Sequence, residues 1–495
     1  MRLQRLTYAA ALIQLCLIQA QNPLQYPSSS PEETLLDDAF NRKVLEHFHI
    51  PGLAISIVHD GKAFAQGYGY SGISTSTPVT ENTLFFTGST TKAHTSAAIS
   101  LLMDDNNNFP QIQWNTPIHT LLPSDFTLSN PSLTSQITIT DMLSHRSGLP
   151  RHDIVLLQNI TTQQIIQRTK HLPLTAEIRM EFHYFEVVSG LPIATFLKER
   201  LWTPLGMDET YMDIEPAGRY ITRTSTARGM SSRLCSDYAN WVSALLEREA
   251  PISKEGYTAL FGAHSIVSGV VSEPFSGPNY KGHTLIQHGG SQDGFGALVV
   301  MLPGEGFGVT VLGNEMVGTN GASWVLAFEL IDRVLGVAGE ERFGWEALVD
   351  AQLQQSKLTN DTLSALYPTL PPTSELLPYP LDLSSYEGIY THPAYPILRI
   401  SSTCPERTPL KNPEKWTGSR LCASFENHAA FASELELDIF HVTGTYWTLV
   451  FWFAGRGDAA RVEFRISPGG GVSEVGVDFE PGMKVRGEKI WLTRV

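Results

Sequence analysis

Short β-strand patterns occur at two places far apart in this chain, and mostly helical patterns fill the interval between them. Residues 52–59 and 62–70 predict two strands joined by an Asp-Gly turn, and residues 284–287, 295–302 and 308–312 predict three more with Gly-rich turns. Strands so far apart in sequence can share one core by joining the same sheet. The sequence therefore predicts an α+β fold in which an antiparallel sheet is flanked by helices and interrupted by an all-α insertion.

The C-terminal part of the chain has a different pattern. Residues 360–380 carry several prolines and predict a linker, whereas residues 383–495 are rich in strand patterns and aromatic side chains and show no helical pattern. A chain of 495 residues is also longer than one ordinary hydrophobic core supports. We therefore expect a main domain over 33–340, a helix and Pro-rich linker over 341–382, and a separate small antiparallel β domain over 383–495.

The first 20 residues predict a signal peptide and thus a secreted protein. Arg2 and Arg5 supply a basic start, a mostly apolar run follows, and Ala20 is a small residue at a plausible cleavage point. The alternative, a buried first helix, lacks a cap and an amphipathic face. No other stretch is apolar enough to span a bilayer, and the net charge of −15 argues against nucleic-acid and anionic-membrane partners.

Cysteines and sequons agree with an oxidising compartment. Cys404 and Cys422 lie close together in the C-terminal region and could form a disulfide between two strands, which leaves Cys235 as a single buried thiol. Asn159 and Asn360 each begin an Asn-x-Thr sequon and are glycosylation sites if they are exposed. No Cys/His group has metal-binding spacing, so neither a metal nor a cofactor is expected.

Ser89 is the candidate nucleophile. Residues 83–87 are β-prone and residues 93–103 have helical spacing, so Ser89 falls at a strand-to-helix junction in the first helical turn. Lys92 follows three positions later and shares its helix face, which lets the amine contact the hydroxyl. A neutral hydroxyl needs a neighbouring base to act as a nucleophile. The alternative interpretation is a helix N-cap followed by a solvated lysine.

Two histidines beyond this helix also invite a catalytic interpretation. His145 and His152 lie on either side of a Gly-Leu-Pro turn, just after a short capped helical pattern. Isolated histidines in packed proteins are more often hydrogen-bonded structural residues. We therefore favour a structural role for both.

Taken in order, the motifs resemble the serine β-lactamase and penicillin-binding protein superfamily, in particular its class C-like branch of esterases, D-amino peptidases and β-lactamase-related proteins of fungi. The resemblance covers roughly residues 33–335, and a Ser-x-x-Lys tetrad is a signature of such enzymes. The stretches that carry it are TGSTTK (87–92), LSHRSGLPRHD (143–153), SGLPIATFLKERLWTPLGM (189–207) and HGGSQDGF (288–295). The family fold implied is the β-lactamase/transpeptidase fold, and the C-terminal region resembles the lipocalin-like β modules that follow such hydrolases.

The resemblance implies a role for each residue near the nucleophile. Ser89 would be the acylated nucleophile, Lys92 its proton partner, and Tyr184 the general base beside them. Without the resemblance, Tyr184 would be taken for an ordinary core aromatic, because tyrosines usually pack in the interior. The family motif continues Tyr-x-Asn, but here Phe185 and Glu186 follow, and most of the next helix is absent from the sequence.

The resemblance also implies a strand that faces the nucleophile. His288, Gly289 and Gly290 would take the place of the third family motif, which is usually Lys-Thr-Gly or His-x-Gly. The backbone N–H groups of Ser89 and Ser291 would form the oxyanion hole. Glycines after His288 would let a substrate pair with the strand backbone.

These observations predict a secreted serine hydrolase that acts on a small-molecule ester or amide, including a β-lactam or a D-amino peptide, through a Ser89 acyl-enzyme. One alternative is a catalytically impaired relic that acts as a binding or structural protein, which the missing segment after Tyr184 favours. Another is an acyltransferase of secondary metabolism, which the signal peptide disfavours. The sequence does not indicate an oligomeric state.

Overall fold

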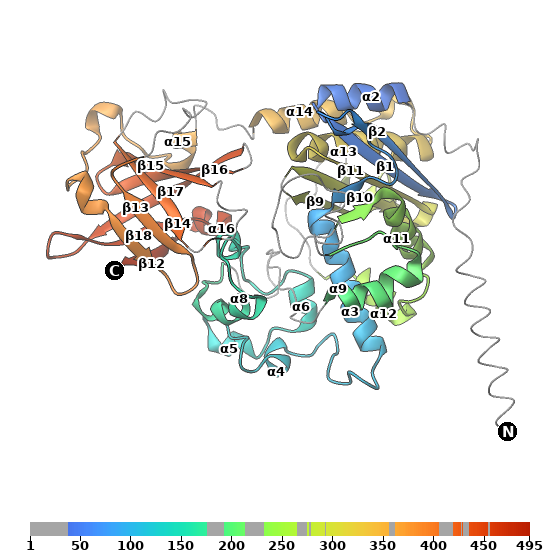
Figure 1. Ribbon diagram of the computed structural model, residues 1–495, viewed down its shortest axis with the longest axis horizontal. Coiled ribbons are helices and arrows are strands. Elements are labelled where there is room, and N and C mark those ends of the chain that lie inside the picture. Colours follow the sequence, from blue (N-terminus) through green and yellow to red (C-terminus); the bar gives the residue numbers. More distant parts are fainter. Residues whose placement is uncertain are drawn as a thin grey trace.

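A computed structural model describes residues 38–175, 193–212, 232–264, 275–276, 279–292, 294–355, 362–404, 419–426, 428, 435–453 and 456–495. These residues form a sheet-containing lobe and a barrel lobe, and a helical segment lies between them (Figure 1). The expected signal peptide over residues 1–20, Tyr184 and the Asn360 sequon lie outside the described residues. Among the described helices, none combines the length and hydrophobicity that crossing a bilayer requires.

The sheet lobe is built on six antiparallel strands in the order β3-β2-β1-β11-β10-β9. β1 pairs with β11, so that Leu53 lies opposite Gly313 and His59 opposite Phe307. The two ends of the domain thus meet in one sheet, which confirms the predicted fold class. β9 forms one edge of this sheet. The strands are β1 (Gly52–His59), β2 (Lys62–Gly72), β3 (Thr77–Pro78), β9 (Ile286–Gln292), β10 (Phe295–Leu302) and β11 (Phe307–Gly313).

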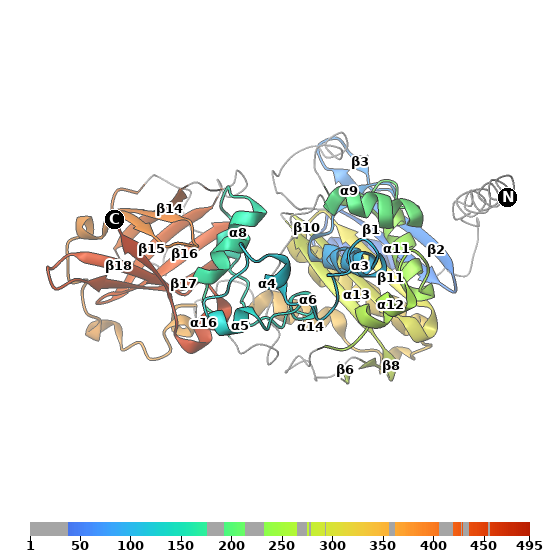
Figure 2. The same ribbon diagram turned by 90° about the horizontal axis from the view of Figure 1, so that it is seen from below.

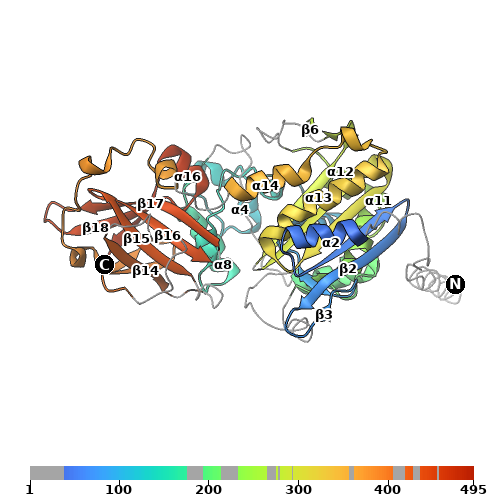
Figure 3. The ribbon, with the colours of Figure 1, turned by 90° about the horizontal axis from the view of Figure 1, so that it is seen from above.

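The side chains of the central strands point alternately to the two faces of the sheet and are apolar on both. Helices therefore cover both faces. On one face, Leu53 and Ile55 of β1 share a core with the helices α2 (Asp38–His47), α13 (Met316–Val334) and α14 (Trp345–Gln355), which Figure 3 shows above the sheet. On the other face, Ala54 and Val58 share a core with residues of the helices α3 (Thr91–Asp104), α9 (Ile193–Leu197) and α11 (Cys235–Glu247). This alternation is what a strand buried on both faces requires. The helix α12 (Lys254–Leu260) lies next to α3.

The second lobe is a closed barrel of eight strands, β12 to β19, in sequence order. β12 pairs with β19 and closes it. The strands are β12 (Gly388–Thr391), β13 (Ile397–Ser401), β14 (Arg420–Glu426), β15 (Glu436–Thr443), β16 (Tyr446–Phe453), β17 (Arg456–Ile466), β18 (Val472–Val477) and β19 (Ile490–Arg494). A small C-terminal β domain is therefore present, as predicted. A disulfide joins Cys404 to Cys422 on β14, with Cα atoms 5.4 Å apart.

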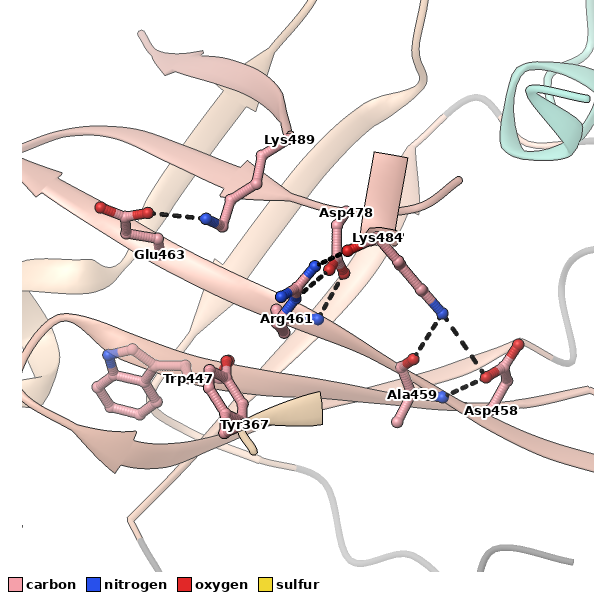
Figure 4. A network of polar contacts seen from close by, with 9 residues as sticks. All are labelled: Tyr367, Trp447, Asp458, Ala459, Arg461, Glu463, Asp478, Lys484 and Lys489. Carbon is pink, nitrogen blue, oxygen red and sulfur yellow. Dashed lines mark hydrogen bonds and ion pairs between the residues drawn. The ribbon is translucent and has the colours of Figure 1, made fainter. Parts of the chain in front are cut away.

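The sequence showed no helical pattern after residue 383, but the structure contains the short helix α16 (Pro481–Arg486). Pro481 stands at its first turn, and Gly487 ends it with a φ of +70°. Polar contacts hold α16 to the barrel, as Figure 4 shows. The Arg461 guanidinium, which also donates to the buried Asp478 at 2.6 Å, donates to the Lys484 carbonyl of α16, and the Lys484 amine donates to the carbonyl of Ala459 at 2.8 Å.

The helical segment between the lobes packs its core with the barrel. It contains the helices α4 (Ile118–Leu121), α5 (Pro131–Thr134), α6 (Ile139–Leu143), α7 (Asp153–Leu156) and α8 (Thr162–Arg168). Buried side chains of this segment, such as Phe126, Leu149 and Ile166, belong to the same apolar cluster as the barrel residues Leu398 and Trp447. Figure 2 shows α8 against the barrel. The C-terminal domain thus packs against the all-α insertion.

Candidate active site

Ser89 lies where β4 (Leu84–Phe86) ends and a short 3-10 turn leads into α3. The Lys92 Nζ donates a hydrogen bond to the Ser89 Oγ at 2.9 Å. Both side chains are partly buried. The structure therefore has the strand-to-helix junction and the hydroxyl–amine contact that the sequence predicted.

The edge strand β9 lies against the start of this helix. A side chain at Gly290 would place its Cβ 2.0 Å from the Thr87 carbonyl oxygen and 3.3 Å from the Ser89 nitrogen. A Cβ at Gly88, whose φ is +52°, would lie 2.7 Å from the Ser291 nitrogen. Only glycine fits such an approach of two backbones. Gly88 and Gly290 therefore bring the backbone nitrogens of Ser89 and Ser291 to the same small space.

Two further contacts order the strand at this point. The Asn320 side chain, from α13, donates to the Ser291 Oγ at 2.6 Å. The His288 ring nitrogen Nδ1 lies 2.6 Å from the carbonyl oxygen of Gly289, and the His288 side chain is exposed. Asn320 follows no recognisable local motif, so sequence reasoning did not identify it.

His145 follows α6 and belongs to the site. Its backbone is left-handed, with a φ of +57°. The pKa of His145 is lowered to about 4, mostly by burial and in part by the charges of Lys92 and His288. The imidazole is therefore neutral at pH 7. Sequence reasoning favoured a structural role, although His145 stands within the 143–153 stretch that resembles the family.

His152 has the structural role that we expected. It is buried, its Nδ1 lies 2.6 Å from the Tyr395 hydroxyl, and its Nε2 lies 3.2 Å from the Pro173 carbonyl oxygen. Its Nδ1 also lies 4.0 Å from a Glu480 carboxyl oxygen. Burial lowers the pKa of His152 to about 4 and raises that of Glu480 to about 7, so both groups favour their neutral forms.

Two hollows meet at this site, and His288 lines both. A polar hollow of about 320 Å³ contains Ser89 and the β9 residues Gly289, Gly290 and Ser291. Arg151 and Asn320 also line it, together with the aromatic Trp324. A second hollow of about 420 Å³ begins at Lys92, His145 and His288 and continues between α3, α6, α11, α12 and β9.

The other predicted sites fall elsewhere. Asn159 is exposed between α7 and α8, so its sequon remains a prediction of glycosylation at an accessible position. Within the described part of the chain, His47, Glu346 and Asp350 are close enough to share a cation. They lie on α2 and α14, not at Ser89, and His47 already pairs with Asp350 at 2.9 Å.

Comparison with known proteins agrees with the fold. The Beta-lactamase family model matches residues 38–327, so the chain belongs to this family of serine hydrolases. It is 32% identical to the unguisins hydrolase ungD' of Aspergillus campestris, over 92% of this chain and 90% of that protein. It is 29% identical to the unguisins hydrolase ungD of Aspergillus violaceofuscus, over 94% and 91%. Protein flp of Staphylococcus aureus is 26% identical over 54% of this chain and 61% of that protein.

A solved structure shares the fold over nearly the whole length. The octameric penicillin-binding protein homologue from Pyrococcus abyssi superimposes with a TM-score of 0.54 at 19% identity, covering 94% of this chain and all of that chain. The likeness therefore includes the barrel lobe as well as the sheet lobe.

Proposed function

We propose that this chain cleaves an ester or amide bond through an acyl-enzyme on Ser89. The observation that carries the proposal is the 2.9 Å contact between the Lys92 amine and the Ser89 hydroxyl beside the β9 edge. An amine in that position can take part in removing the hydroxyl proton, which makes the oxygen nucleophilic. Tyr184, as the expected general base, would complete this group.

The reaction would proceed in two balanced steps. Ser89 Oγ bonds to the substrate carbonyl carbon, its proton passes to the Lys92–Tyr184 pair, and that proton then reaches the departing alcohol or amine. Water next attacks the acyl-enzyme and releases the acid, which regenerates the Ser89 hydroxyl. No oxidant, reductant or cofactor is required in either step.

The oxyanion that forms in each step needs hydrogen-bond donors. The backbone N–H groups of Ser89 and Ser291 are the proposed donors, and the close approach of Gly88 and Gly290 supports this assignment. Each donor of this kind typically contributes about 3 kcal/mol to lowering the barrier. The start of α3 adds its positive dipole end near the same point.

We also propose that the substrate is a compound of the unguisin type and that the protein is secreted. The substrate proposal rests on the names of the two Aspergillus relatives, whose similarity covers more than nine tenths of this chain. Secretion rests on the expected signal peptide, and the Cys404–Cys422 disulfide supports an oxidising compartment. A β-lactam or a D-amino peptide is the second substrate class to try.

The test compares wild-type protein with Ser89→Ala on unguisins and on a p-nitrophenyl ester. We expect kcat/KM to fall by at least about 1,000-fold in Ser89→Ala. Ser100→Ala, which changes a serine on the same helix away from both hollows, is the matched control and should retain activity. Folded wild-type protein that turns over none of these substrates would support the relic alternative instead, and transfer to an added alcohol in place of water would support the acyltransferase.

A further inference from the structure

We infer that the 420 Å³ hollow behind Lys92 is the leaving-group site, and that it accepts a bulky apolar group on the departing alcohol or amine. The inference rests on the proposed acyl-enzyme function and adds to it the class of substrate. In a peptide, the group would be an apolar residue directly after the bond that is cleaved.

The lining of this hollow is mostly apolar, although it also includes polar residues such as Ser96, His264 and Gln287. Lys92, His145 and His288 stand at the end near Ser89. The remaining walls are mostly aliphatic and aromatic, from five separate elements: Leu143, Trp241, Leu245, Leu260, Phe261, Ile286 and Met301. The volume lies within the range of roughly 300–1,000 Å³ that small-molecule sites occupy. Such a surface favours an apolar group over water.

The route of the proton decides which part of the substrate enters the apolar hollow. The groups that take the Ser89 proton must return it to the leaving oxygen or nitrogen, so that atom has to face the Lys92 side of the scissile carbon. Lys92 lines the apolar hollow, whereas Ser89 lines the polar one. The substituent on the leaving atom therefore points into the apolar hollow.

The polar hollow then holds the acyl part. It offers the β9 backbone at Gly289 and Gly290, the Asn320 amide and the Arg151 guanidinium. These groups suit a polar acyl chain with hydrogen-bonding capacity. The neutral state of His145 agrees with an apolar neighbour, because a charged imidazole would lose hydration when that neighbour binds.

Two ester series test the inference. Alkyl acetates from methyl to hexyl lengthen the alcohol at nearly constant leaving-group reactivity, and methyl esters from acetate to hexanoate lengthen the acyl group. We expect kcat/KM to rise about threefold per methylene in the alcohol series and to change much less in the acyl series. A steep acyl series with a flat alcohol series would overturn the assignment.

A cavity-filling variant sharpens this test. Ala259 on α12 lines the hollow, whereas the nearby Ala263 is exposed and does not. We expect Ala259→Trp to remove most of the chain-length preference, and Ala263→Trp to behave as wild type. Unchanged preference in folded Ala259→Trp would contradict the inference.

Binding of the product alcohol separates this inference from the catalytic proposal. Calorimetry with 1-hexanol and Ser89→Ala protein should detect saturable binding that Ala259→Trp, added to that variant, weakens at least about tenfold. If wild-type protein hydrolyses no ester but the alcohol binds in this way, the catalytic proposal fails and the apolar site stands. Ester turnover without such binding would overturn the site alone.

Discussion

His145 and His152 stand seven residues apart in one loop and are alike in backbone conformation and in the direction of their pKa shift. Both have left-handed backbones, and burial lowers the pKa of each to about 4. Their partners differ completely. His145 faces Lys92 and His288 at the candidate active site, whereas His152 contacts Tyr395 in the barrel lobe.

This comparison teaches that a perturbed pKa does not by itself mark a functional histidine, because burial is the largest cause of the lowered pKa in both residues. What distinguishes the two is the chemistry of residues far away in the sequence. It also shows that this loop reaches both the candidate active site and the barrel lobe. Arg151 in this loop lines the polar hollow, and its neighbour His152 is anchored on the barrel.

The largest effect should be on stability and should come from His152, where the loop contacts the barrel. In His152→Ala, the Tyr395 hydroxyl loses a buried partner and a cavity forms between the lobes. We expect the free energy of unfolding to fall by about 3 kcal/mol. Chemical denaturation measures this loss, and kcat/KM of the folded fraction should stay within about threefold of wild type. A large loss of activity at unchanged stability would contradict the structural role that we assign to His152.

At His145, which lies at the candidate active site, substitution should lower activity more than stability. We expect His145→Ala to lower kcat/KM by about tenfold, since it removes a neutral imidazole beside Lys92 and His288, and to change the free energy of unfolding by less than about 1 kcal/mol. Ester hydrolysis and denaturation on the same preparation give both values. His145→Asn, which keeps a polar side chain, should recover part of the activity.

The pH dependence of stability distinguishes His152 from its acidic neighbour. Because the folded pKa of His152 is lowered from 6.5, the unfolded chain takes up its proton first, and stability falls as the pH drops from about 6.5 to about 4. Glu480 acts in the other direction. Its folded pKa is raised from 4.5 to about 7, so it makes stability rise as the pH drops through that window. The two effects oppose each other.

Glu480→Gln should therefore make the loss of stability below pH 7 steeper, by up to about 1.4 kcal/mol per pH unit. Denaturation curves at several pH values between 4.5 and 8 measure the slope. The charges of Asp153, Arg151 and Lys484 also act on this carboxyl and are left in place. A slope equal to that of wild type would show that Glu480 is ionised in the folded protein throughout this range.

The smallest effect should come from the ion pair between Arg151 and Asp153, the two residues on either side of His152 in the sequence. Arg151 and Asp153 are 2.7 Å apart, but their side chains are 55% and 52% exposed. Exposed pairs contribute less than about 1 kcal/mol, so Asp153→Asn should change the free energy of unfolding by no more than that. Any effect on KM for a polar acyl substrate should disappear in 1 M salt. An effect on KM that persists in 1 M salt would indicate that the ion pair holds Arg151 in a fixed position.

The sequence predicted the features that depend on local patterns. Alternating strands and turns predicted the sheet, and the three-residue spacing predicted the contact between Lys92 and Ser89. It missed α16, whose six residues are too few for a helical period to show and which polar contacts to the barrel hold in place. It also missed Asn320, which reaches Ser291 only through packing across the lobe.

The relation between the lobes could not be predicted either. The barrel shares an apolar core with the insertion, and the Gln158 amide of the insertion donates to the Ala394 carbonyl at 2.8 Å. The hydrophobic periodicity of a segment does not show which surface, formed by residues far away in the sequence, will pack against it. Tyr184 remains a prediction, since it lies outside the described residues.

Intact-mass spectrometry of the protein treated with a fluorophosphonate or a fluorescent penicillin tests the central claim most directly. We predict one added adduct, mapped by peptide sequencing to Ser89, and no adduct in Ser89→Ala or, at neutral pH within the same time, in Lys92→Met. An adduct on another serine, or equal labelling of Ser89→Ala, would contradict the account.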